Sequence, residues 1–132
     1  MGCGACSYYG CLEEEMNCGE NGYLLHFARE YCLRYRLVSE PLANPEGAAW
    51  LMRVRRCLIE ELDAAYPFKS CSQLEKVGFD SHPNCYVDTG FCELSVSDWL
   101  AVLATIKSSD FSFREMLVAG NLCLNRWLNP AK

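Results

Sequence analysis

Cysteine is the residue whose number and spacing carry most of the chemistry in this sequence. A thiol can act as a nucleophile, a metal ligand or one half of a disulfide. An even number of cysteines at high density is typical of a disulfide framework in an oxidising compartment. Ten cysteines occur among 132 residues, at Cys3, Cys6, Cys11, Cys18, Cys32, Cys57, Cys71, Cys85, Cys92 and Cys123. We therefore expect five bridges and a secreted, extracellular protein.

Cys3 and Cys6 have the Cys-x-x-Cys spacing of redox and zinc sites. A redox site of this kind accompanies a βαβ unit, and a structural zinc site needs a second matched pair. The sequence contains neither. We expect both cysteines to form structural bridges, and we expect no metal site here.

The two histidines, His26 and His82, are the residues that could act as a base, a ligand or a pH-sensitive group. A hydrolase would also need a serine elbow, an unpaired cysteine or a paired-histidine motif, and the sequence has none of these. We therefore predict that the protein is not an enzyme, with no catalytic residues and no cofactor.

Clustered acidic residues could bind calcium through their carboxylate oxygens. Asp80, Asn84 and Asp88 fall on one segment, but Cys85 stands where an EF-hand requires glycine. Four glutamates near the start are the better candidates for weak calcium binding: Glu13, Glu14, Glu15 and Glu20. The alternative is that they form an ordinary solvated acidic face.

Six arginines fall on two neighbouring predicted helices and could meet an anionic partner. They are Arg29, Arg34, Arg36, Arg53, Arg55 and Arg56. As candidate partner-binding residues we select Arg29, Arg36, Arg53 and Arg56. Helical acids such as Glu30, Glu60 and Glu61 leave open the alternative of solvated ion pairs.

The overall charge and hydropathy exclude other partners. The net charge is −5, so a nucleic-acid partner is not expected. No apolar run is long enough for a membrane span, and residues 1–10 lack the basic and apolar regions of a secretory signal. We expect a leader to have been removed from the mature chain.

Helical periodicity runs through most of the sequence. Apolar residues three and four apart predict a helix over residues 22–37, followed by a loop around Ser39–Ala43. Asn44, Pro45 and Glu46 then form a start signal for a helix from about 45 to 66, with Asn44 as the cap. Its expected buried stripe is Trp50 or Leu51, Val54, Cys57 or Leu58, and Leu62 or Ala65.

Two further helices begin at capping boxes. Ser95 with Asp98, and Ser112 with Glu115, predict helices near 96–107 and 113–127. Between Cys71 and Cys92 the expectation is a short helix over Ser72–Val77 and then an irregular segment over Gly78–Phe91. No strand-like alternation occurs. Residues 1–132 should form one all-α domain, a disulfide-clamped bundle of four to five helices.

The cysteine order and several short motifs resemble stanniocalcin, a secreted disulfide-rich hormone. The motifs are Gly2-Cys3-Gly4-Ala5, Cys6-x4-Cys11-Leu12-Glu13, Gly47-x9-Cys57 and Cys71-x13-Cys85-x6-Cys92, and the resemblance covers nearly the whole chain. It implies the pairs Cys3–Cys11, Cys6–Cys32, Cys18–Cys71, Cys57–Cys85 and Cys92–Cys123. With every cysteine paired inside one chain, no covalent dimer is expected, and a non-covalent dimer remains possible.

The resemblance implies a secreted regulatory protein of the hormone type, with a role connected to calcium and phosphate balance. Its partner would be an extracellular receptor or protease. Two other classes stay open: a carrier of small apolar ligands, with aromatic side chains lining a cavity, and a calcium-binding protein of the extracellular matrix. The secreted regulatory protein of the hormone type is our leading hypothesis.

Overall fold

The regular elements of the chain are helices throughout the part that the structure describes. The computed structural model describes the backbone of residues 3–103 and 111–129, and the side chains of residues 3–103 and 117–129. The main helices are α1 (Ser7–Met16), α2 (Arg29–Arg34), α3 (Glu40–Leu42), α4 (Pro45–Ala65), α5 (Cys71–Asp88), α6 (Val96–Leu103) and α7 (Phe111–Leu128). The prediction of a single all-α domain is confirmed.

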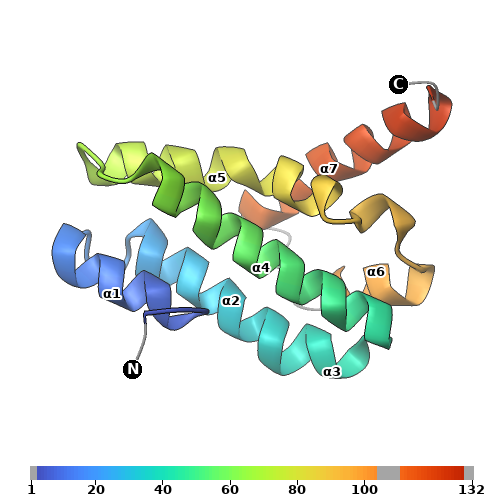
Figure 1. Ribbon diagram of the computed structural model, residues 1–132, viewed down its shortest axis with the longest axis horizontal. Helices are drawn as coiled ribbons and strands as arrows, with labels where there is room; N and C mark the ends of the chain where they lie inside the picture. Colours follow the sequence, from blue (N-terminus) through green and yellow to red (C-terminus); the bar gives the residue numbers. More distant parts are fainter. Residues whose placement is uncertain (1–2, 104–110, 130–132) are drawn as a thin grey trace.

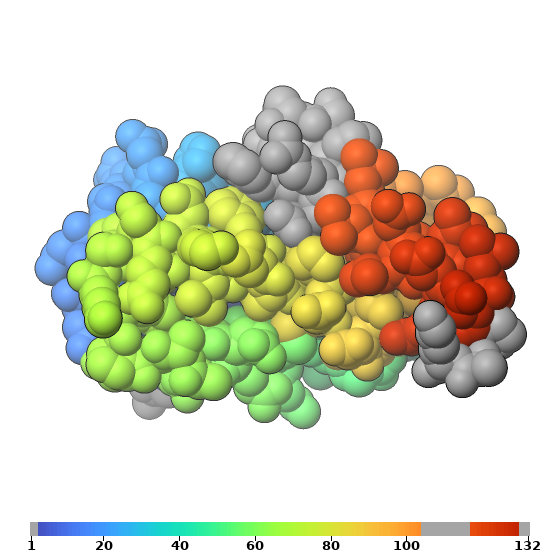
Figure 2. Space-filling model, turned by 90° about the horizontal axis from the view of Figure 1, so that it is seen from above, coloured from blue at the N-terminus to red at the C-terminus, as the bar shows by residue number. Residues whose placement is uncertain are grey.

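The long helices pack as a bundle around α4 and α5. In Figure 1, α4 crosses between α5 and the segment that holds α2 and α3, while α1 lies beside the start of that segment. Helix α7 packs on α5 at the other end of the molecule. Seen from above in Figure 2, α5 occupies the middle of the face and α7 one end of it.

Five disulfides hold these helices together. They are Cys3–Cys11, Cys6–Cys32, Cys18–Cys71, Cys57–Cys85 and Cys92–Cys123, and no cysteine is free. These are the pairs that the family resemblance implied. Cys6–Cys32 fixes the N-terminus to α2, Cys57–Cys85 joins α4 to α5, and Cys92–Cys123 ties the turn after α5 to α7.

The interior has two apolar clusters. One joins α4, α5 and α7 around the fully buried Trp50 and Tyr86. The other joins α1 and the residues around α2 to the ends of α4 and α5, through Leu62 and Leu74. Both clusters receive residues from α4, whose predicted stripe is confirmed: the buried residues are Gly47, Trp50, Leu51, Val54, Leu58 and Leu62.

Helix α1 was not predicted. Tyr9 and Leu12 form its buried face, but the cap at Cys6 makes no side-chain hydrogen bond and the first turn holds no acidic residue. The helix ends at Asn17 in the left-handed conformation, where Glu13 accepts hydrogen bonds from two backbone N–H groups. This helix was missed because its start carries no recognisable capping signal.

The predicted helix over residues 22–37 is longer than expected. It begins with a π-helical turn, η1 (Tyr23–Ala28), continues through α2 and a second π-helical turn, η2 (Tyr35–Ser39), and ends with α3 at Leu42. The predicted loop around Ser39–Ala43 is therefore mostly wrong. Glu40 forms an ion pair with Arg55 of α4 at 2.9 Å, and this contact supports the helical backbone where the sequence suggested a loop.

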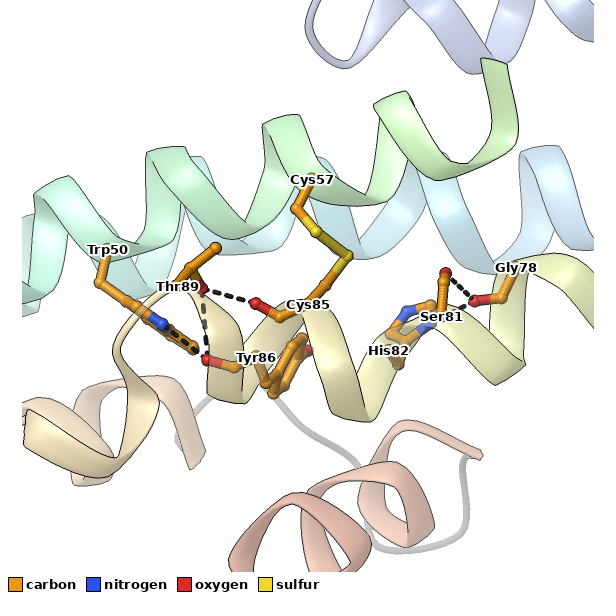
Figure 3. Close-up of a disulfide and its surroundings, with 8 residues drawn as sticks. All are labelled: Trp50, Cys57, Gly78, Ser81, His82, Cys85, Tyr86 and Thr89. Atoms are coloured by element: carbon orange, nitrogen blue, oxygen red, sulfur yellow. Dashed lines mark hydrogen bonds between the residues drawn. A yellow bond between two sulfur atoms is a disulfide. The ribbon is translucent and has the colours of Figure 1, made fainter. Parts of the chain in front are cut away.

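Residues 71–88 form one continuous helix, so the predicted irregular segment over Gly78–Phe91 is wrong. Proline lacks an N–H group and usually interrupts a helix, which is why Pro83 suggested a break. Here α5 continues past Pro83 because its flanking residues are anchored. His82 and Tyr86 are buried, and Cys85 is bonded to Cys57 (Figure 3). The chain turns at Thr89 and Gly90, directly after α5, with Gly90 at a φ of 114°.

The start of α6 follows the predicted capping box, because the Ser95 hydroxyl accepts a hydrogen bond from the Asp98 backbone N–H at 3.2 Å. The end predicted for this helix, residue 107, lies outside the described residues. Helix α7 begins and ends close to its predicted bounds. The side chains of the second capping box lie outside the described residues too. None of the described helices has the length and apolar character that crossing a membrane requires.

Candidate binding surface

The candidate arginines divide among three surface hollows. Arg36 and Arg56 line the same hollow. Arg29 lies in a second one, together with Arg34, and Arg53 lies in a third, together with Arg126. The structure thus brings together two of the four arginines selected from the sequence and separates the other two.

We call the hollow with Arg36 and Arg56 the arginine hollow. It has a volume of about 470 Å³, and it lies where the N-terminal segment, the residues after α2 and the exposed side of α4 meet. The described residues that line it are Ala5, Cys6, Cys32, Arg36, Met52, Arg55, Arg56, Ile59 and Glu60. Three of these nine residues are basic and one is acidic, so the hollow is positive in a chain whose net charge is −5.

Arg36 and Arg56 are exposed, and no ion pair or hydrogen bond of either side chain is found among the described residues. Arg29, in the second hollow, likewise has no such partner among the described residues, whereas Arg53 and Arg34 each make a contact. Arg53 donates to the Thr89 carbonyl oxygen at 3.1 Å, and the Arg34 guanidinium lies 5.6 Å from the centre of the Tyr31 ring. The two hollow arginines therefore keep their charge available to a ligand.

Arg55, which our sequence-based selection omitted, also lines the hollow, and its side chain is held by an ion pair. Only 14% of its side chain is exposed, and its Nη2 donates to the Glu40 carboxylate at 2.9 Å. Its Nη1 is buried and has no hydrogen-bond partner among the described residues. The sequence could not predict the ion pair of Arg55, because Glu40 meets Arg55 only through the helical extension to Leu42, which was not predicted.

The arginine hollow also has apolar lining residues. Met52 is 53% exposed, Ile59 is partly buried, and the bonded cysteines Cys6 and Cys32 line the same hollow. An exposed methionine is an adaptable apolar contact, and arginine binds carboxylates with paired hydrogen bonds. The arrangement suits a ligand that presents an acidic group next to an apolar side chain.

The four candidate calcium glutamates do not converge on one point. Both carboxylate oxygens of Glu13 accept backbone N–H groups, from Cys18 at 3.0 Å and from Gly19 at 2.7 Å. Glu15 accepts a hydrogen bond from the Tyr66 hydroxyl, and Glu20 lines the hollow that contains Arg29 and Arg34. Glu14 is exposed.

Among the described residues, one group has the geometry of a metal site, and it consists of Cys57, Glu61 and Cys85. Its two sulfur atoms belong to one disulfide, and a disulfide offers no thiolate to a metal. This group therefore does not supply the donors that zinc prefers.

His82 is buried among aromatic rings, and Figure 3 shows it on α5 between Gly78 and Tyr86. Burial lowers the pKa of His82 to about 4, against a smaller upward effect of its hydrogen bond to the Gly78 carbonyl. The ring is neutral at physiological pH. Because a carbonyl oxygen can only accept, Nδ1 is the ring nitrogen that donates to Gly78, at 2.6 Å. The rings of Phe27, Phe79 and Tyr86 surround it, and the Tyr86 hydroxyl is hydrogen-bonded to Tyr35, whereas His26 is exposed.

The aromatic side chains in this region fill the interior instead of lining a ligand chamber. Tyr35 and Tyr86 share a hydrogen bond between their hydroxyl groups, and burial raises the pKa of both phenols. The cavity beside them has a volume of about 20 Å³, which is room for about one water molecule. A drug-sized apolar ligand needs a pocket of roughly 300 Å³ or more.

The chain was compared with protein families, curated proteins and solved structures. The chain shows no significant match to a protein-family model, to a curated protein or to a solved structure.

Proposed function

We propose that this chain is a secreted, non-enzymatic regulatory protein of the stanniocalcin type, which acts by binding another extracellular protein through the arginine hollow. The observation that carries the proposal is the pair Arg36 and Arg56: both are exposed, neither has an ion-pair partner among the described residues, and both line a hollow that apolar side chains line too. Arginine and methionine are enriched in protein interfaces.

Secretion is supported by the five bridges, since disulfides persist in oxidising compartments. The pairing also agrees with the pairing that the stanniocalcin resemblance implies. A connection to calcium and phosphate balance rests on that resemblance.

The arrangement of the hollow favours a regulatory binding role over the two alternatives. A carrier would need an enclosed apolar chamber. The interior cavity beside Tyr35 and Tyr86 accommodates about one water molecule, and the larger hollows described above are open to solvent and lined in part by charged residues. A calcium-binding matrix protein would need several carboxylates close together, and the four candidate glutamates do not form such a group among the described residues.

Capture from the natural extracellular fluid tests the proposed function. The oxidised protein is immobilised, bound proteins are identified by mass spectrometry, and the strongest candidate is purified and titrated into the free protein by calorimetry. We expect one extracellular protein to bind with a defined stoichiometry. No binding by any purified candidate, together with a small organic molecule that co-purifies with the native chain, would contradict the proposal and favour a carrier.

A further inference from the structure

The positive charge that the arginine hollow offers to a ligand is small and local. The charge of Arg55 is neutralised by its ion pair with Glu40. Arg36 and Arg56 have no ion pair among the described residues, and Glu60 is the one acidic residue among the described residues that line the hollow. Two free positive charges and one negative charge leave a single positive charge. This balance suits a group that carries one negative charge.

The candidate arginines do not form a continuous positive surface. They lie in three separate hollows, and each hollow also contains at least one acidic residue. A sulfated polysaccharide or a nucleic acid carries charges at short intervals and binds along an extended positive groove. The net charge of −5 also repels such a polyanion. The arginine hollow is therefore suited to a single anionic group and not to a repeating one.

The two free guanidinium groups favour an anion with more than two acceptor oxygens. One guanidinium can satisfy both oxygens of a carboxylate with paired hydrogen bonds, which leaves the second guanidinium without a full partner. A sulfate ester has one negative charge and three terminal oxygens, so Arg36 and Arg56 can both donate to it. A phosphate ester has the same oxygens but carries a charge of about −1.5 to −2 at pH 7, more than the hollow offers.

The lining beside the arginines favours an aromatic carrier for the sulfate. Met52 is 53% exposed, and Ile59 and the bonded cysteines Cys6 and Cys32 line the same hollow. A thioether makes favourable contacts with aromatic rings, and guanidinium groups stack on ring faces. The volume of about 470 Å³ leaves room for a ring with an anionic substituent. An aromatic ring that ends in a sulfate ester therefore matches both parts of the lining.

The backbone that carries Arg36 supports a binding role without reference to charge. Arg36 lies in the π-helical turn η2, whereas Arg56 lies in the regular helix α4. π-Helical turns are rare and are frequently found at functional sites. The arginine hollow is therefore distinguished both by its lining and by the local backbone of one of its two free arginines.

We propose that the arginine hollow binds a sulfated tyrosine side chain of the extracellular partner. The sulfate ester accepts hydrogen bonds from Arg36 and Arg56, and the tyrosine ring packs on Met52 and Ile59. Tyrosine sulfation takes place in the secretory pathway, so the modified residue occurs on proteins that a secreted chain meets. The inference rests on the proposed function, because it names the group that the partner presents to the hollow.

Calorimetric titration of the oxidised chain with short peptides tests this inference. The probe is a peptide with one sulfotyrosine, and matched peptides carry tyrosine, glutamate or phosphotyrosine at that position. We expect the sulfotyrosine peptide to bind at least about tenfold more tightly than each matched peptide. A sulfated oligosaccharide without a peptide should also bind more weakly. Binding of the oligosaccharide or of any matched peptide as tight as that of the sulfotyrosine peptide would overturn the inference.

Variants of the hollow locate the bound group. Arg36→Ala with Arg56→Ala should weaken binding of the sulfotyrosine peptide at least about tenfold. Arg29→Ala with Arg53→Ala removes the same charge from the other two hollows and should stay within about threefold of the wild type. Met52→Ala should weaken the peptide but not inorganic sulfate, since it removes a contact with the ring. Circular dichroism checks that each variant stays folded. Equal weakening by both arginine pairs, or an unchanged affinity in Met52→Ala, would contradict the placement.

The purified partner separates this inference from the proposed function. Partner produced with tyrosine sulfation blocked should bind at least about tenfold more weakly than the sulfated partner. If both forms bind equally and Arg36→Glu with Arg56→Glu still weakens them, the sulfotyrosine inference is overturned while the proposed function stands. If neither form depends on the arginine hollow, the proposed function fails as well.

Discussion

Asp98 of α6 accepts a hydrogen bond from the backbone N–H of Asn44, the residue that precedes α4, with 2.7 Å between the nitrogen and Oδ1. Asp98 is only 2% exposed, and its carboxylate lies at the positive end of the α4 dipole, a position that stabilises negative charge. The side chain of Asn44, which the sequence suggested as the cap, donates instead to Ser97 at 2.9 Å. A residue 54 positions away thus completes the start of α4.

Removal of this carboxylate should destabilise the fold. Asp98→Ala leaves the Asn44 N–H without its partner, and we expect a loss of about 1–3 kcal/mol in the free energy of unfolding. Urea denaturation followed by circular dichroism measures this change. Asp88→Ala, at an exposed position, should change stability by less than about 0.5 kcal/mol. Equal effects of the two replacements would show that the Asp98 contact is not formed.

Gly78 is required where α5 passes Tyr23. A Cβ atom at this position would overlap the Tyr23 ring, and both residues are buried. Gly78→Ala should therefore destabilise the protein by about 1–3 kcal/mol, as overpacking does. In contrast, a Cβ at Gly10 of α1 has its nearest neighbour, on Arg29, at 3.9 Å. Gly10→Ala should stabilise the helix by about 0.5–1 kcal/mol. Thermal unfolding of both variants compares the signs.

His82 should make the fold sensitive to mild acid. Its pKa is lowered to about 4 in the folded protein from 6.5, so the unfolded chain binds the proton more readily between these values. The stabilising contribution of the neutral ring is complete above pH 6.5 and is lost as the pH falls toward 4. The difference corresponds to about 3 kcal/mol.

The pH dependence of urea unfolding in His82→Gln measures this contribution. The variant should lose less stability than the wild type between about pH 6.5 and 4.5, whereas His26→Gln, at an exposed position, should follow the wild type. Identical slopes for the wild type and His82→Gln would mean that His82 is not held neutral.

Two bridges allow a test of loop length with little change in burial. Cys18–Cys71 closes a sequence separation of 53 residues, and Cys3–Cys11 closes one of 8. In the chain-entropy model, replacement of both cysteines by serine costs about 4 kcal/mol for the long loop and about 2.5 kcal/mol for the short one. Chemical denaturation of the two double variants checks the order. A larger loss for Cys3–Cys11 would contradict this account.

The predictions from sequence succeeded where local patterns agree with tertiary contacts. The apolar stripe of α4 and the capping box at Ser95 needed no knowledge of distant residues. The prediction that the helix breaks near Pro83 was wrong because contacts with distant residues stabilise α5 there. These contacts are the bond between Cys85 and Cys57 and the burial of His82 and Tyr86.

The candidate site shows the same division. Arginines on two neighbouring helices could be selected from their spacing, but their distribution among three hollows depends on how α2 and α4 pack. The role of Arg55 depends on Glu40, which lies in a segment that the sequence suggested to be a loop. The sequence of this chain therefore predicts which arginines are candidates, but not the contacts between helices that decide how they are grouped.

The proposed function depends most directly on the arginine hollow, and the dissociation constant of the purified extracellular partner measures it. Arg36→Glu with Arg56→Glu reverses both hollow charges, and Arg29→Glu with Arg53→Glu makes the same change in net charge at exposed arginines of the other two hollows. Our account predicts that the hollow variant binds at least tenfold more weakly and that the control binds within about threefold of the wild type. Equal weakening by both pairs, or none by the hollow pair, would contradict it.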